Sequence, residues 1–372
     1  MGSGFGDGYK KGIFDWQLTS LAANQEDWVY DTGRWCGGFL DTVVDDKNHL
    51  PDWVIGPFTK HTANPVLEPT PGAWDRGRYG GGVHNGSVLV LDGLFYYVYR
   101  GEQELDPPVN GVDYMCDIGM ASSKDGIIFT KDDVHSPFFR TGEDSRFSFE
   151  DVCLVRHEDC FYLFCNRWDW QHQTPQVSGA CLATSKDLRN WTKHGLIFPD
   201  AKEIHRNPVV LQTPDNLAVR ANGRFVMYLN SGLIAYSDDL IHWTSKKIAA
   251  PWPGGENCFA MVDWSETYPD HILLFSGGHH SGHFYAIGEV LLDRHDSENA
   301  IEWLPRPILH AEPVYPWEDG RCAAPPHRRI SQFRDCIFFN GLTQHDGQWW
   351  LYYGGSEFYT CLAQAAAPSV RG

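Results

Sequence analysis

Residues 92–99 read Asp-Gly-Leu-Phe-Tyr-Tyr-Val-Tyr, a turn-forming pair followed at once by a run of aromatic and apolar side chains. An Asp-Gly pair favours a tight hairpin turn, and aromatic and β-branched residues favour strands. Similar aromatic-rich runs occur at residues 161–164, 224–228, 272–275 and 349–353. The stretch therefore predicts a buried hairpin strand that the chain repeats, and such repetition is the signature of a repeat architecture.

A second strand-like segment of small and apolar residues follows each aromatic run. These segments cover residues 118–122, 180–184, 233–236, 285–290 and 360–363. Five hairpins at intervals of roughly 50 to 75 residues suit a β-propeller, because each blade of a propeller is a four-stranded sheet. A pair of β-sandwiches would explain five similar hairpins less economically. We therefore predict an all-β fold, a five-bladed β-propeller over residues 51–372, with residues 1–50 as an N-terminal extension or cap.

Three of the second segments continue into a shared pattern, Ser-x-Asp-x-x-x-aromatic. Its members are Ser123/Asp125/Phe129, Ser185/Asp187/Trp191 and Ser237/Asp239/Trp243. In such a turn the Asp carboxylate accepts backbone N–H bonds, and the aromatic ring is expected to pack between neighbouring sheets. Because the pattern recurs in several repeats while only one active site can exist, we interpret it as structural.

The composition limits the partners that the chain can have. It holds 30 Lys and Arg against 48 Asp and Glu, a formal net charge of −18, which repels nucleic acid and anionic lipid. No apolar stretch reaches the roughly 18 residues that span a membrane. Ten cysteines occur without zinc-type spacing, and no signal-peptide pattern is visible. We therefore expect a reduced, cytoplasmic setting, no metal, no organic cofactor, and neither nucleic acid nor membrane as a partner.

Polar residues stand at matching places beside the aromatic runs. A propeller gathers loops from every blade around one central depression, so the residues of a site should come from different repeats. The candidates are His84-Asn85-Gly86 and Arg100, Glu150 and Asp151, Arg206 and Asn207, Glu256 and His279, and Asp335 and Glu357. We expect them to line a polar pocket on the axis, although strand-end caps are the plainer interpretation of each one alone. Clustered His279, His280 and His283 are expected to bind sugar hydroxyls or line a loop rather than hold a metal.

The order of several short motifs resembles glycoside hydrolase family 130, the mannoside phosphorylases and β-mannosidases with five-bladed propellers. Residues 64–67, Asn-Pro-Val-Leu, resemble the family's opening Asn-Pro-Ile-Leu, and Tyr99-Arg100 is similar to its sugar-contacting Tyr-Arg pair. Glu150-Asp151 resembles its Glu-Asp-Pro-Arg motif, whose Asp is the general acid, and Arg206-Asn207 looks like its Lys-Asn pair. The resemblance marks the chain as a divergent member.

The C-terminal half resembles the family more densely. Residues 285–293 resemble its Tyr-x-x-Gly-x-x-Leu-Leu-Asp, and residues 306–313 resemble its Pro-Ile-Leu followed by Glu-Pro. Residues 352–363 resemble its closing Tyr-Tyr-Gly-Ala-Ala-Asp and Leu-Ala. The chain departs from the family at Val152-Cys153, where the family has Pro-Arg, and at Glu357, where it has Asp. A basic segment with Arg321 and residues 327–329 has no clear counterpart.

The resemblance implies cleavage of a β-mannoside with Asp151 as proton donor. The apolar neighbours of Asp151 in sequence, residues 147–149 and 152–155, predict that desolvation raises its pKa. A hydrolase needs a second carboxylate that activates water, about 6.5 to 9.5 Å from the first for inversion. Glu256 is the first candidate for this base, and Glu357 is the weaker one.

A phosphorylase would instead hold inorganic phosphate, its co-substrate, with converging cations. The candidates are Arg206, His279, Arg321, Arg328 and Arg329. Because the family's Arg beside the acid is missing and a Glu stands in a pocket loop, we favour inverting hydrolysis of β-mannoside-type linkages in oligosaccharides. Phosphorolysis and a non-catalytic carbohydrate-binding propeller remain the alternatives. Propellers of this kind often pair, so a homo-oligomer is also considered.

Overall fold

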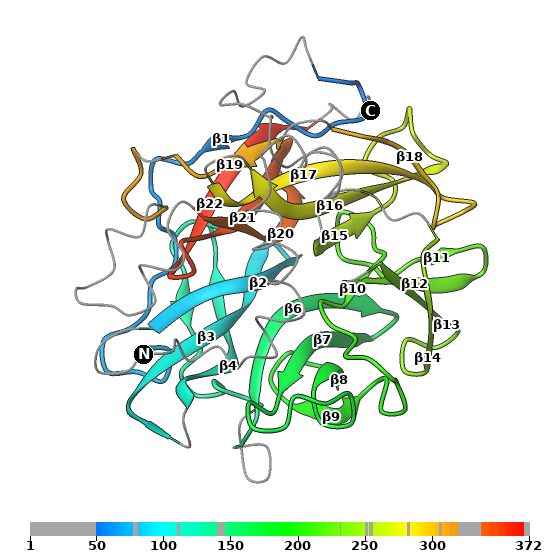
Figure 1. Ribbon diagram of the computed structural model, residues 1–372. Coiled ribbons are helices and arrows are strands. Elements are labelled where there is room, and N and C mark those ends of the chain that lie inside the picture. The colour runs from blue at the N-terminus through cyan, green and yellow to red at the C-terminus, as the bar shows by residue number, and fades with distance from the viewer. Residues whose placement is uncertain are drawn as a thin grey trace, which may run out of the picture.

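Five antiparallel sheets radiate from a common centre in the computed structural model (Figure 1). The structure describes residues 50–76, 81–109, 112–139, 146–230, 232–249, 252, 256–280, 283–304, 307–312, 314–318 and 336–367. Over these residues the secondary structure is strands and turns, and no helix long and apolar enough to cross a membrane occurs. The prediction of an all-β, five-bladed propeller is confirmed.

Each sheet is one blade, and its strands follow one another along the chain. Blade one is β2 (Gly81–Leu91), β3 (Leu94–Val109), β4 (Val112–Ser123) and β5 (Thr130–Lys131). Blade two is β6 (Ser148–His157), β7 (Cys160–Trp168), β8 (Gly179–Ser185) and β9 (Trp191–Leu196). Blade three is β10 (Val209–Val210), β12 (Arg224–Leu229), β13 (Leu233–Ser237) and β14 (Trp243–Lys247), with β11 (Arg220–Ala221) paired to β12. Blade four is β15 (Glu256–Met261), β16 (His271–His280), β17 (His283–Asp293) and β18 (Ala300–Trp303), with β19 (Leu309–His310) paired to β17.

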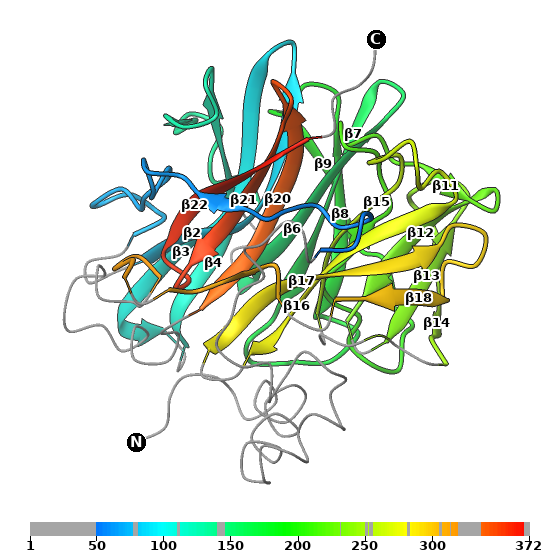
Figure 2. The same ribbon diagram turned by 90° about the horizontal axis from the view of Figure 1, so that it is seen from above.

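Blade five is built from both ends of the described chain. It consists of β20 (Ile337–His345), β21 (Gln348–Gly355), β22 (Tyr359–Ala366) and the early strand β1 (Thr59–Lys60). Strand β1 lies along the outer edge of β22, with Thr59 opposite Gln364 (Figure 2). The ring is therefore closed by hydrogen bonds between two segments that are far apart in sequence.

Buried polar contacts stabilise the pairing of β1 with β22. The ammonium of Lys60 lies 2.7 Å from the Glu318 carboxylate and 2.9 Å from that of Glu312, and both the Lys60 and Glu318 side chains are almost fully buried. Asn64 extends the pairing, because its amide donates to the Leu362 carbonyl at 2.9 Å and accepts from the Leu362 N–H at 2.7 Å. The Asn-Pro motif at residues 64–65 thus has a structural role in closing the ring.

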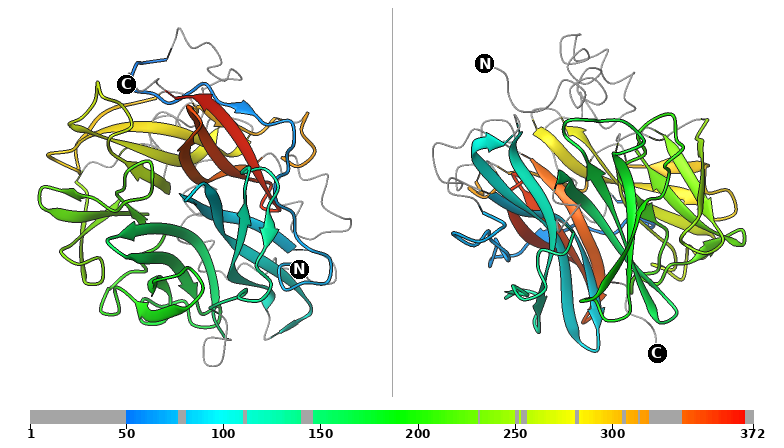
Figure 3. Two further views of the ribbon diagram at one scale, coloured as in Figure 1. Left: turned by 180° about the vertical axis from the view of Figure 1, so that it is seen from behind. Right: turned by 90° about the horizontal axis from the view of Figure 1, so that it is seen from below.

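The aromatic runs form the second strand of every blade, and the small-residue segments form the third. The predicted hairpin turns that precede the aromatic strands are confirmed, with positive φ values at Asp92 (52°), Glu158 (53°), Asn222 (50°) and Asp346 (48°). Such values suit the tight turns that match strand twist. Figure 3 shows the resulting ring of sheets from behind and from below. The prediction of residues 1–50 as an extension or cap lies outside the described residues, apart from Leu50.

The Ser-x-Asp turns join the third strand of a blade to its fourth, as predicted. The Asp125 carboxylate accepts the N–H groups of Ile127 and Ile128 at 2.9 and 2.8 Å. The Phe129 ring then packs against Tyr97 of its own blade and Tyr352 of blade five. Asp187 and Asp239 make the same backbone bonds in blades two and three. These turns therefore pin aromatic side chains between neighbouring sheets.

One buried acid lies away from the axis, on the third strand of blade four. Glu289 is 0% exposed, and its Oε2 accepts the Ile55 N–H at 3.0 Å. Its Oε1 has no hydrogen-bond partner among the described residues. Burial raises the pKa of Glu289 well above its ordinary value, and the Ile55 N–H only partly opposes this. The segment that precedes β1 is thus held against blade four by a carboxyl that favours its neutral form.

This acid is expected to make stability depend on pH. Because the folded pKa of Glu289 lies above the unfolded pKa of about 4.3, its contribution is complete below that pH and is lost as the pH rises through the folded pKa. Between pH 5 and 6 the unfolding free energy should fall more steeply in the wild type than in Glu289→Gln, by up to about 1.4 kcal/mol per pH unit. Urea unfolding at both pH values measures this difference. Equal slopes in the two proteins would contradict the assignment to Glu289.

Candidate functional site

The innermost strands share an irregularity that turns one polar side chain toward the axis. The pairing of first and second strands shifts between His84 and Ser87, Glu150 and Cys153, Asn257 and Phe259, and Phe339 and Gly341. Within two of these bulges Asn85 and Asp151 adopt positive φ values of 45° and 55°. A bulge re-aims a side chain and is common beside active sites. The bulge therefore recurs in blades one, two, four and five, where it can turn a polar side chain toward the centre.

The axial hollow is lined by one Asn or Asp from each blade. The five are Asn85, Asp151, Asn207, Asn257 and Asn340, and the neighbouring walls are formed by Gly86, Val152, Cys153, Pro208, Val209, Cys258, Phe338 and Phe339. A concave site with a few convergent polar groups is the usual form of a small-molecule pocket. The predicted polar pocket on the axis is therefore present in the structure.

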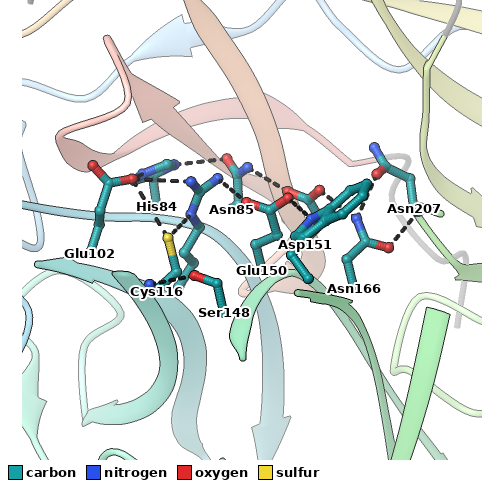
Figure 4. A network of polar contacts seen from close by, with 11 residues as sticks. His84, Asn85, Glu102, Cys116, Ser148, Glu150, Asp151, Asn166 and Asn207 are labelled. Atoms are coloured by element: carbon teal, nitrogen blue, oxygen red, sulfur yellow. Dashed lines mark hydrogen bonds and ion pairs between the residues drawn. The ribbon is translucent and has the colours of Figure 1, made fainter. Parts of the chain in front are cut away.

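Asp151 is the acidic member of this ring, and side-chain amides hold both of its oxygens (Figure 4). Asn85 Nδ2 donates to Asp151 Oδ1 at 2.6 Å, and Asn166 Nδ2 donates to Asp151 Oδ2 at 2.8 Å. Asn166 also bonds Asn207, which links the acid to blade three. The Asp151 carboxylate therefore accepts hydrogen bonds from side-chain amides of blades one and two, at a hollow that Val152 and Cys153 also line.

Glu150 points from the same strand into a buried ion-pair network. Its Oε2 lies 3.0 Å from Nη1 of Arg100, and its Oε1 accepts the indole N–H of Trp168. Burial raises the pKa of Glu150 to about 7, with the positive charge of Arg100 opposing the rise and the negative charge of Asp151 adding to it. A carboxyl that titrates near neutral pH thus stands directly beside Asp151.

Arg100 is held by blade one as well as by blade two. Its Nη2 donates to Glu102 Oε2 at 3.0 Å, and its Nε donates to Cys116 Sγ at 3.1 Å (Figure 4). The backbone N–H of Cys116 in turn donates to Ser148 Oγ of blade two at 2.7 Å. A guanidinium fixed on three sides is a rigid donor, and rigidity of this kind favours precise substrate placement.

A second buried ion pair lies on the other side of the hollow. Arg206 Nη2 donates to Glu256 Oε1 at 2.7 Å, and both side chains are about 8% exposed. Burial raises the pKa of Glu256, Arg206 lowers it in part, and the charges of Asp151 and Glu357 raise it further. Glu357, in the turn between β21 and β22, also acts on the charge of Arg100. These three carboxyls from three blades therefore share one electrostatic environment.

The described charges around the hollow sum to a negative value. Arg100 and Arg206 stand against the carboxyl groups of Glu102, Glu150, Asp151, Glu256 and Glu357. Each guanidinium already contacts at least one carboxylate. Among the residues that the structure describes, no group of three or more His, Cys, Asp or Glu could hold a metal ion. The arrangement can therefore donate and accept protons, while an added anion would meet net repulsion from these groups.

The structure brings together most of the predicted site residues. Those around the hollow are Asn85, Arg100, Glu150, Asp151, Arg206, Asn207, Glu256 and Glu357. His279 lies on β16 without a described side chain, and Asp335, Arg321, Arg328 and Arg329 lie outside the described residues. The chemical roles of all these residues stay predictions.

Several residues of the site were missed by the sequence analysis. They are Glu102, Cys116, Asn166, Trp168 and Asn340. The sequence does contain a signal for Asn340. In blades one, two and five an Asn or Asp precedes the residue of the hairpin turn by six or seven positions. The pairs are Asn85 and Asp92, Asp151 and Glu158, and Asn340 and Asp346. The others are found only through spatial contact.

Comparison with known proteins links the site to enzymes that act on mannosides. No protein-family model matches the chain. It is 27% identical over 301 residues to a 1,2-β-oligomannan phosphorylase of Thermoanaerobacter sp. (strain X514), covering 79% of this chain and 92% of that protein. The predicted resemblance to glycoside hydrolase family 130 is confirmed by this similarity together with the structural matches.

Two solved structures show the same fold. One belongs to the GH130 family of mannoside phosphorylases, described as containing glycoside hydrolases that target β-1,2 mannosidic linkages in Candida mannan; it is 22% identical, has a TM-score of 0.69 and covers 86% of this chain and 98% of its own. The other is β-1,2-mannobiose phosphorylase from Listeria innocua in complex with β-1,2-mannobiose. It is 18% identical, has a TM-score of 0.62 and covers 83% of this chain and 97% of its own.

Proposed function

We propose that the chain is a glycoside hydrolase that cleaves β-mannoside linkages, β-1,2 linkages first among them, in oligosaccharides. Asp151 is the proton donor, Glu256 is the base, and the reaction inverts the anomeric carbon. The observation that carries the proposal is the placement of Asp151 on the axial hollow, with both oxygens held by amides and its charge acting on Glu256 of another blade. The similarity to a 1,2-β-oligomannan phosphorylase supports the linkage.

The two amides that contact Asp151 do not compete for its proton. Asn85 and Asn166 both present N–H groups to the carboxyl, so neither amide accepts the proton of the neutral acid. The proton is left for the glycosidic oxygen, whose bond to the anomeric carbon breaks through an oxocarbenium-like transition state. Water attacks the opposite face of the sugar ring while Glu256 takes its proton. The raised pKa of Glu256 makes this carboxylate a better base than an exposed one.

The charge around the hollow supports water over phosphate as the attacking group. Arg206, the one proposed phosphate ligand whose side chain the structure describes, is already paired with Glu256 at 2.7 Å. A phosphate dianion would have to displace this carboxylate and lie near Asp151 and Glu357 as well. Replacing one buried partner of an ion pair is costly unless the new partner matches it closely.

Phosphorolysis is the second candidate. One observation favours it, because the Thermoanaerobacter relative, which is similar over 79% of this chain, is named a phosphorylase. In this alternative, inorganic phosphate is the co-substrate and attacks the anomeric carbon in place of water. Its ligands would be Arg206, His279, Arg321 and Arg328, as the sequence predicts. Arg206 would then have to turn from Glu256 toward the anion.

Product analysis with and without phosphate separates the candidates. The purified chain is incubated with β-1,2-mannobiose and β-1,4-mannobiose, and sugars and sugar phosphates are identified by chromatography and NMR. Equal release of mannose in both conditions, appearing first as the α-anomer, is the result that hydrolysis predicts. Mannose 1-phosphate formed only with phosphate would overturn it in favour of phosphorolysis. Saccharide binding without any product would instead identify a carbohydrate-binding propeller.

We also infer that the protein acts in a reducing, cytoplasmic setting. The cysteines that the structure describes all carry free thiols. Cys165 and Cys181 lie opposite each other on neighbouring strands, with their sulfur atoms 3.2 Å apart and not bonded. The inference extends the prediction from the sequence, in which ten cysteines occur without zinc-type spacing.

A further inference from the structure

We propose that His84 is a positioning residue for the proton donor: it orients the Asn85 amide so that only N–H faces Asp151. The inference rests on the proposed role of Asp151 as the acid and extends it to a residue that does not touch the substrate-facing carboxyl. His84 lies on β2 of blade one, and Asp151 lies on β6 of blade two (Figure 4). The connection between them is the Asn85 side chain.

The direction of the hydrogen bonds follows from the atoms that face each other. The Asn85 atom 2.6 Å from Asp151 Oδ1 is the amide nitrogen, which can only donate. The Asn85 oxygen then faces His84 Nδ1 at 3.0 Å, and this ring nitrogen carries the hydrogen. The His84 tautomer and the orientation of the amide therefore determine each other.

The surrounding residues hold the His84 imidazole in a fixed orientation. His84 is 0% exposed. A Cβ on Gly82 would lie 2.9 Å from the ring atom Cδ2, so this glycine makes room for the ring, and a Cβ on Gly354 would lie 3.3 Å from His84 Cβ. On the far side, Nε2 lies 3.8 Å from Glu102 Oε2. Glu102 is in turn bound by Arg100. The ring thus has no room to turn over.

The second amide that donates to Asp151, that of Asn166, is oriented by a second hydrogen bond as well. Asn166 Nδ2 donates to Asp151, while Asn166 Oδ1 accepts the backbone N–H of Asn207 at 2.9 Å. Each amide therefore has its oxygen occupied by a second donor and its nitrogen facing the acid. The donor behind Asn166 is main chain, whereas the donor behind Asn85 is the His84 side chain, which a substitution can remove.

Loss of the Nδ1 hydrogen would free the Asn85 amide to turn over. Its oxygen would then face Asp151 and accept the proton of the neutral acid, in competition with the glycosidic oxygen of the substrate. The charged groups that face His84 and Asp151, namely Glu102, Arg100 and Glu150, would remain in place. We therefore expect a defect in proton transfer rather than in substrate binding.

A pair of amide substitutions tests the position of the donor. In His84→Asn the side-chain N–H occupies about the place of Nδ1, whereas in His84→Gln it lies one bond farther, near Nε2. His84→Gln should lower kcat by about 10- to 100-fold with KM within about threefold of wild type, and His84→Asn should restore most of the rate. His84→Phe, which keeps a ring but no donor, should behave as His84→Gln does. Replacement of the exposed His242 by Asn serves as the control.

The measurements are kcat, KM and the pH profile of kcat on β-1,2-mannobiose, each corrected for the folded fraction by circular dichroism. Equal rates for the folded Asn and Gln variants, whether high or low, would overturn the proposal. An atomic-resolution crystal structure of the Gln variant gives the orientation of the Asn85 amide without any need for turnover. A wild type without activity would refute the proposed function, whereas an unturned amide in the Gln variant would refute the role of His84 alone.

Discussion

Replacing Asp151 by Asn should lower kcat for β-mannoside cleavage by about 1,000-fold, because general acids contribute roughly 10²- to 10⁴-fold to such reactions. Asn has nearly the same shape as Asp, but it has no proton of suitable acidity to give to the leaving oxygen. Its oxygen can still accept the Asn85 or Asn166 bond. Steady-state kinetics with β-1,2-mannobiose measures kcat, and calorimetric titration of the variant measures whether the saccharide still binds.

Asp187→Asn is the matched control for this experiment. Asp187 lies in the same blade, in a surface turn, where its carboxylate accepts the N–H groups of Arg189 and Asn190. It should leave kcat unchanged while it weakens the turn. Retention of more than a tenth of wild-type kcat in Asp151→Asn would remove Asp151 from the role of proton donor.

Glu256→Gln should also lower the rate of hydrolysis by about 1,000-fold, since a base that activates water contributes in the same range as a general acid. The Gln oxygen can still accept the hydrogen bond from Arg206, so the substitution removes the basic group and leaves its neighbours in place. The quantity to measure is mannose release with β-1,2-mannobiose in phosphate-free buffer.

Glu357→Gln provides the comparison for the base. This residue shares the electrostatic environment of Glu256 but forms the turn between β21 and β22, and its loss is expected to reduce the rate far less. A larger loss in Glu357→Gln than in Glu256→Gln would exchange their roles. Cleavage by Glu256→Gln that recovers when phosphate is added would show that phosphate, not water, is the attacking group.

The fold follows from the sequence because its signals are local and repeated. The aromatic runs and the turn residues before them, such as Asp92-Gly93, encode a hairpin within about ten residues. The Ser-x-Asp turns are likewise self-contained, as the bonds of Asp125 to Ile127 and Ile128 show. Closure of the ring by β1 was not predicted, since a two-residue strand has no periodicity to recognise.

The site follows from the sequence only in part. Asn85, Asp151 and Asn207 stand out because polar residues interrupt apolar strands at equivalent places. Contacts between blades, such as that of Asn166 with Asn207, join residues that share no local pattern. The hydrogen-bond partners of Asp151 were not predicted for the same reason, because Asn85 comes from blade one and Asn166 from another strand of blade two.

Because blade five joins β1 to β20, β21 and β22, the order of synthesis has a consequence for the growing chain. Strand β1 leaves the ribosome about 300 residues before its partner β22, since the two begin at Thr59 and Tyr359. Because synthesis adds about 5 to 20 residues per second, the backbone of Thr59 and Lys60 stays without its strand partner for many seconds. Blades one to four can assemble during this interval, yet the hollow lacks Asn340 and Glu357 until the last stretch appears. The complete site therefore forms only when β22 has been synthesised and pairs with β1.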